Sequence, residues 1–144
     1  MTMFHVGLSA DFMKGDGSPA FPQFDLSPLD RDDGIQWRFV PVRHGRLEAS
    51  DVAGLDAMIL LAARFDRDSF PGDGRLALIA RFGVGYDAVD VEACTSNRVA
   101  LTIKPNGVRR PVAVAIITFM LALSGKLFQK DRIAREGPQG WARR

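Results

Sequence analysis

Short apolar runs recur along the first hundred residues and are separated by polar segments rich in glycine and proline. The run at 57–62, AMILLA, is apolar at every position, which is typical of a strand covered on both faces of a parallel sheet. Pro41 confines its own run to a sheet edge or a strand end, because proline has no amide hydrogen to donate. The pattern predicts five strands, at residues 4–10, 35–42, 57–62, 75–82 and 99–103.

Short helical segments are expected between these strands. Ser27 and Pro28 can cap and begin one helical turn, a weak helix is expected from Ser50, and Asp90 is placed to cap a two-turn helix in DVEACTSN. Strands that alternate with helices indicate an α/β architecture. Right-handed crossovers would then place helices on both faces of a parallel sheet.

A long helix is predicted over residues 109–135. Its first half contains PVAVAIITFMLALSG at 111–125 and is apolar all round, so we expect it to be buried. No predicted element after it can pack against its second face. A homodimer formed through the apolar helix 111–128 is therefore expected. The apolar stretch falls short of the ~18–20 residues that span a bilayer, which argues against a membrane helix. Residues 136–144, EGPQGWARR, are expected to be a linker.

Composition narrows the possible functions. The 144 residues carry a net charge of +2 with scattered arginines, so no nucleic-acid partner is expected. The single cysteine, Cys94, has no CxxC motif or nearby histidine, so no metal site is predicted and a reducing cytoplasm fits. The N-terminus lacks the cationic and apolar regions of a signal peptide.

The candidate chemistry lies in RFGVGYDAVD at 81–90, where a predicted strand ends in Gly83, Val84 and Gly85. A glycine-rich turn at the carboxyl edge of an α/β sheet can offer backbone amides to an anion. A plain strand-to-helix turn has the same spacing, so both interpretations stay open on spacing alone. The sequence contains neither GxGxxG nor GxxxxGK[ST], and no cofactor-binding residue is predicted.

The ordered stretches ARFGVGYDAVD, ACTSNRVALTIKPNGV and VAVAIITFMLAL resemble the D-isomer-specific 2-hydroxyacid dehydrogenases, the family of D-3-phosphoglycerate dehydrogenase and glyoxylate/hydroxypyruvate reductase. The resemblance covers about residues 50–141. It implies a flavodoxin-like substrate-binding domain at 1–108, a long interdomain helix at 109–135, and a linker at 136–144 toward a nucleotide domain. The chain is thus expected to be a truncated form of such an enzyme.

The resemblance also implies an oxidoreductase that transfers a hydride between NAD or NADP and a small 2-hydroxy or 2-keto acid. In proteins of this kind, the backbone amides that match Val84 and Gly85, next to Gly83, hold the substrate carboxylate. The catalytic arginine, glutamate and histidine of the family match no residue here, so no catalytic residue is expected in this chain. We expect no NAD binding and no turnover by the chain alone. The alternative is a non-catalytic α/β module that binds a small anion or dimerises.

Overall fold

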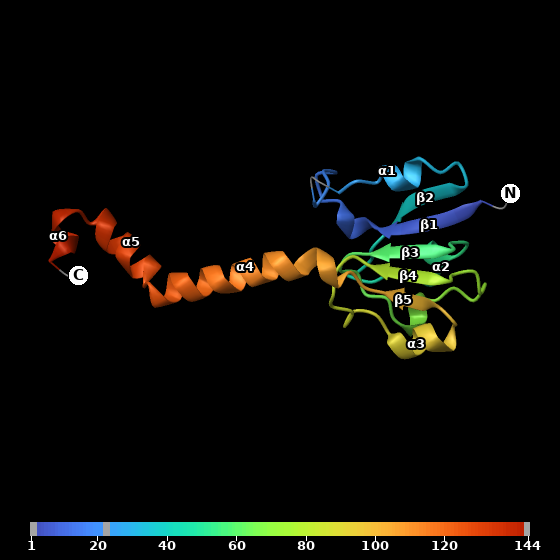
Figure 1. Cartoon of the computed structure of the whole chain (residues 1–144). Helices are drawn as coiled ribbons and strands as arrows, with labels where there is room; N and C mark the ends of the chain where they lie inside the picture. The colour runs from blue at the N-terminus through green and yellow to red at the C-terminus, as the bar shows by residue number, and fades with distance from the viewer. Residues whose placement is uncertain (1–2, 22–23, 143–144) are drawn as a thin grey trace. The chain divides into compact units, whose positions relative to one another are not determined.

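The structure is a computed structural model that describes residues 3–21 and 24–142, and it divides into two compact units. The first unit reaches to Lys104, and the second begins at Pro105. Figure 1 shows the elements of both units. The predicted boundary at residue 108 thus differs from the observed division by a few residues.

The first unit is built on a five-stranded parallel sheet (Figure 1). Its strands are β1 (Phe4–Ser9), β2 (Ile35–Val40), β3 (Ala57–Leu60), β4 (Leu78–Arg81) and β5 (Ala100–Thr102). They lie in the order β2-β1-β3-β4-β5, and every neighbouring pair is parallel. This is the flavodoxin-like order. The prediction of a parallel α/β sheet is confirmed, and β2 is an edge strand that ends before Pro41.

Helices cover both faces of this sheet, as predicted. They are the α-helices α1 (Ser27–Asp30), α2 (Ala49–Val52) and α3 (Val91–Ser96) and the 3₁₀-helices η1 (Ala10–Phe12) and η2 (Arg67–Ser69). On one face, Val52 of α2 and Cys94 of α3 pack in a buried cluster with Met58 and Ile79 of the sheet. On the other face, Leu29 of α1 packs against a second cluster. Asp90 caps α3 by accepting from Ala93 N at 2.8 Å, as expected.

The second unit contains α4 (Pro105–Ser124), α5 (Leu127–Arg135) and α6 (Pro138–Trp141). The prediction of one continuous helix to residue 135 is wrong, because the chain turns after Ser124. Lys126 adopts a left-handed conformation with φ +52°, which ends one helix and lets another begin. The segment expected to be a linker contains the short helix α6.

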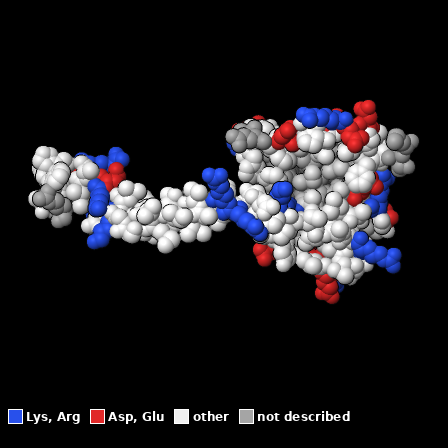
Figure 2. All heavy atoms as spheres, in the orientation of Figure 1, with Lys and Arg blue, Asp and Glu red and all other residues white. Residues whose placement is uncertain are grey.

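Helix α4 also begins earlier in the chain and is more exposed than predicted. It has 20 residues, and by length and composition it could cross a membrane. The apolar stretch 111–125 is short, but the helix that contains it is long enough to span a bilayer, contrary to the expectation. Within the second unit the predicted burial is not found, since Phe119 and Leu123 are 66% and 70% exposed. Figure 2 shows an almost uncharged surface along this helix, whose charged residues are Arg109 and Arg110 near its start.

Candidate functional site

The candidate site is the loop that follows β4, between Phe82 and Val89, in the first unit. Because the sheet is parallel, this loop leaves its carboxyl edge, where open α/β sheets bind ligands. The predicted residues Gly83, Val84 and Gly85 all lie in this loop. Their backbone geometry decides what it can bind.

Gly83 is held on both sides by backbone hydrogen bonds. Its amide donates to Arg81 O at 2.9 Å, and its carbonyl accepts from Lys104 N, after β5, at 2.7 Å. Its φ of +143° lies in a region that favours glycine. A Cβ at this position would lie 2.6 Å from Nη1 of Arg81, a flexible side chain that can move aside, so the positive φ is what favours glycine at the start of the loop.

The next five amides, from Val84 to Ala88, have no acceptor among the residues that the structure describes, and the following backbone bond joins Val89 N to Tyr86 O at 2.9 Å. The first two of these amides are the pair that the family resemblance implies. Gly85 leaves space around its backbone, since an added Cβ would meet only Asp87 Oδ2, at 3.6 Å. Two adjacent free N–H groups can bind the two oxygens of one carboxylate.

Two cationic residues contact Gly83, at the start of this loop. Arg81 and Lys104 form no ion pair with any acid in the described parts of the chain, and the Arg81 guanidinium donates to the carbonyl of Phe82. Both cations line a shallow hollow of about 310 Å³ together with Ile59, Ala80, Phe82, Thr102 and Ile103. The positive charge favours an anion at this edge, whereas Asp87 opposes one.

The far end of the loop is tied to the segment after β3. Phe65 N donates to Ala88 O at 2.8 Å, and Asp90 N donates to Phe65 O at 2.9 Å. This short parallel bridge joins Phe65 to Val89. The loop is thus fixed at Gly83 and again at Val89, and the free amides lie between these two points.

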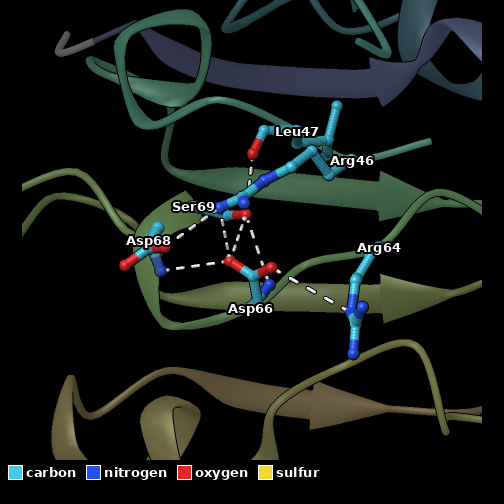
Figure 3. Close-up of polar contacts among 6 residues, drawn as sticks. All are labelled: Arg46, Leu47, Arg64, Asp66, Asp68 and Ser69. Atoms are coloured by element: carbon cyan, nitrogen blue, oxygen red, sulfur yellow. Dashed lines mark hydrogen bonds and ion pairs between the residues drawn. The ribbon is translucent and has the colours of Figure 1, made fainter. Parts of the chain in front are cut away.

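A polar network fixes the segment after β3 in turn (Figure 3). Arg46 donates to Oδ1 of Asp66 at 2.9 Å, and Oδ1 of Asp66 also accepts from Asp68 N at 3.1 Å. Ser69 is fully buried and donates through its hydroxyl to Leu47 O at 2.7 Å. Its Oγ also accepts from Asp66 N, which completes a capping box on η2. These contacts are structural, although Nε of Arg46 is buried without a partner among the described residues.

Two polar side chains at the end of β1 were not singled out by the sequence. Ser9 Oγ accepts from Leu61 N at 3.0 Å, and Oδ2 of Asp11 accepts from the amides of Ala62 and Ala63 at 2.8 Å each. They join β1 to the segment after β3, where the order of the strands reverses direction. A serine and an aspartate after a strand are too common to signal this role. No metal-binding cluster of acids, histidine or cysteine occurs within residues 3–21 and 24–142.

The sequence of this edge matches a known protein family. The model of the D-isomer specific 2-hydroxyacid dehydrogenase catalytic domain matches residues 30–114, more than half of the chain, including β4 and the loop after it. The chain belongs to this family. The match begins about twenty residues before the resemblance noted in the sequence and ends inside α4.

Individual relatives agree with this assignment. A glyoxylate reductase from Thermococcus kodakarensis is 33% identical over 94 residues, which cover 65% of this chain and 28% of the relative. One from Pyrococcus furiosus is 30% identical over 130 residues, which cover 87% of this chain and 37% of the relative. The chain therefore spans about a third of the length of these family members.

Solved structures of longer proteins contain the same fold. D-mandelate dehydrogenase from Rhodotorula graminis matches 98% of this chain and 43% of its own, with a TM-score of 0.68 and 20% identity. NAD-dependent formate dehydrogenase from Staphylococcus aureus, in complex with NAD, matches 94% of this chain and 42% of its own, also with a TM-score of 0.68 and 20% identity. At such identities the likeness concerns the fold alone.

Proposed function

We propose that this chain forms the substrate-carboxylate site of an NAD(P)-dependent D-2-hydroxyacid dehydrogenase. Such an oxidoreductase transfers a hydride between a nicotinamide cofactor and a small 2-hydroxy or 2-keto acid. The observation that carries the proposal is that the amides of Val84 and Gly85 are free. They lie in the loop after β4, inside the region that matches the family. These donors bind and orient the substrate carboxylate, and Arg81 and Lys104 add a favourable potential.

Hydride transfer also needs a bound cofactor and catalytic side chains, and no residues of this chain correspond to them. The cofactor would supply or accept the hydride at its nicotinamide ring, but the 144 residues contain no GxGxxG sequence to bind its pyrophosphate. The family's catalytic arginine, glutamate and histidine also match no position. By itself the chain is therefore proposed to bind the acid without binding NAD tightly and without turnover.

Titration of the ¹⁵N-labelled full chain with glyoxylate tests this function. Because two charge-assisted hydrogen bonds in an exposed loop give weak affinity, we expect dissociation constants in the millimolar range, with the amide resonances of Val84 and Gly85 shifting most. Gly85→Pro removes one donor and should abolish most of this response.

Gly85→Ala is the matched control, because it keeps the N–H group and its Cβ has room. Acetate should shift the same amides, while ethanol should not, if the carboxylate is the recognised group. Shifts that are spread over the surface and survive Gly85→Pro would overturn the proposal. NADH-dependent reduction of glyoxylate by the purified chain would overturn the expected lack of turnover.

A second function, a dimerising or small-anion-binding module without catalysis, is favoured by α4. This helix presents apolar side chains all round within its own unit, including Ile117, Phe119 and Leu123. Exposed apolar surface of this extent marks an association site. We propose a homodimer through residues 111–128.

Light scattering coupled to size-exclusion chromatography tests the dimer directly. We expect twice the chain mass of 15.8 kDa, and Phe119→Lys together with Leu123→Lys should give the monomer. A monomer that binds no hydrophobic dye would contradict the dimer. Co-flotation of the chain with lipid vesicles would assign α4 to a membrane instead.

A further inference from the structure

Phe82, which is 41% exposed, lies between β4 and the free amides in the chain, and three aromatic rings contact its ring. The ring of Phe82 meets Phe12 edge to face, with centroids 5.3 Å apart, and meets Phe24 edge to face at 5.4 Å. Phe21 contacts it at 5.6 Å. Phe12 and Phe24 stack on each other at 4.6 Å with an interplanar angle of 7°. Such edge-to-face and stacked pairs are the favoured aromatic geometries.

The partners of Phe82 come from a distant part of the chain that the sequence presented only as a loop. Phe12 ends η1 and is 1% exposed. The chain then turns back through a bridge between Met13 and Pro19, and Ala20 N donates to Phe12 O at 2.8 Å. This return places the following aromatic residues beside Phe12. Phe12, Phe21 and Phe24 are thus all brought into contact with the Phe82 ring.

The backbone of Phe82 connects this cluster to the binding loop. Its amide donates to Leu60 O at the end of β3, at 2.7 Å. The next residue is Gly83, whose two backbone hydrogen bonds fix the turn, and the free amides of Val84 and Gly85 follow at once. A rotation of the backbone at Phe82 would therefore redirect both donors. The ring contacts oppose such a rotation, because it would separate packed rings.

We infer that Phe82 is a positioning residue for carboxylate binding, held by the rings of Phe12, Phe21 and Phe24. This role rests on the proposed function. The cluster acts before any ligand arrives, since it fixes the donors in one geometry and so lowers the ordering cost of binding. Phe12, Phe21 and Phe24 thereby serve the site without touching the substrate.

The experiment compares Phe82→Ala and Phe82→Tyr in the ¹⁵N-labelled full chain. Phe82→Ala removes the ring, so glyoxylate should bind about five-fold or more weakly, and the heteronuclear NOE of the Val84 and Gly85 amides should fall in the free protein. Phe82→Tyr keeps the ring, so the glyoxylate affinity and the NOE should stay close to those of the unmodified chain. Phe24→Ala removes a partner ring and should act in the same direction as Phe82→Ala.

Phe39→Ala is the matched control. It removes an edge-to-face contact with Trp37 at 5.5 Å on the edge strand β2, so it should lower stability without changing glyoxylate affinity. Unchanged affinity and unchanged loop NOE in folded Phe82→Ala would overturn the inference while leaving the carboxylate site intact. If glyoxylate fails to shift the amides of the unmodified chain, the proposed function fails, and the positioning role fails with it.

Discussion

The carboxylate of Asp11 accepts a hydrogen bond from the amide of Ala62 at 2.8 Å, although 51 residues separate the two along the chain. The same oxygen accepts from Ala63 N, while Oδ1 is buried without a partner among the described residues. One side chain thus links the segment after β1 to the segment after β3 at the carboxyl edge of the sheet. The loop after β3 in turn supports the candidate site through Phe65.

Removing this carboxylate should destabilise the fold. Asp11→Ala leaves two amides without their acceptor, and we expect a loss of about 1–3 kcal/mol in the free energy of unfolding. Asp11→Asn keeps one carbonyl oxygen for these amides and should cost less. Urea denaturation followed by circular dichroism measures both, and an alanine variant as stable as the unmodified chain would contradict the role of Asp11.

Gly7 is predicted to tolerate no side chain, because β1 passes close to the core of the first unit. A Cβ at this position would lie 2.5 Å from Leu55 Cδ1, 2.7 Å from Met58 Sδ and 2.8 Å from Val40 Cγ2. Gly7→Ala should therefore cost about 1–3 kcal/mol through overpacking. Gly15→Ala is the control, since its Cβ would meet nothing within 4 Å. Thermal unfolding of both variants compares the two positions.

The ion pair between Asp56 and Arg75 predicts acid sensitivity. Arg75 donates to both carboxylate oxygens at 2.9 Å, and these hydrogen bonds, chiefly, lower the pKa of Asp56, with a further contribution from His5 N. A carboxyl whose pKa is lower in the folded state stabilises the fold above its unfolded pKa of about 4. This contribution is then lost as the pH falls through the folded pKa.

Asp56→Asn should remove this part of the pH dependence. Urea midpoints measured between about pH 7 and pH 3 should fall less steeply for the variant than for the unmodified chain. Asp33→Asn alters an exposed acid and serves as the control. Parallel curves for the unmodified chain and Asp56→Asn would show that the pair does not contribute.

Cys94 should be unreactive in the folded protein. The side chain is free and 2% exposed, and burial raises the pKa of its thiol, as does the nearby charge of Asp90. Little thiolate is available near pH 8, so a disulfide reagent should react about 100-fold more slowly than with the chain in urea. Rapid labelling under native conditions would show that α3 opens readily.

The strands were predictable because each one carries its own local signal. The apolar run at 57–62 identified a strand with neighbours on both sides, and β3 does lie between β1 and β4. Pro41 placed its strand at an edge for an equally local reason, the missing amide hydrogen. The break after α4 was missed because the left-handed turn at Lys126 depends on the backbone, and Gly125 alone is a weak signal for it.

The candidate site was only partly predictable. Gly83, Val84 and Gly85 were identified by their resemblance to a family, while their spacing alone favoured a plain turn over an anion site. The hydrogen bonds that fix the two ends of this loop are visible only in the tertiary structure: Lys104, from the segment after β5, bonds to Gly83, and Phe65 bonds to Ala88 and Asp90. No local pattern could predict these bonds, because their partners are distant in sequence.

The sequence by itself determined the parallel α/β class, the edge position of β2, and membership in a family of 2-hydroxyacid dehydrogenases. These properties depend on periodicity, on single residues and on ordered motifs, all of which are local. The tertiary structure decided which amides remain free and which rings surround Phe82. The physical reason is that hydrogen-bond satisfaction and side-chain packing depend on contacts between segments that are far apart in the chain.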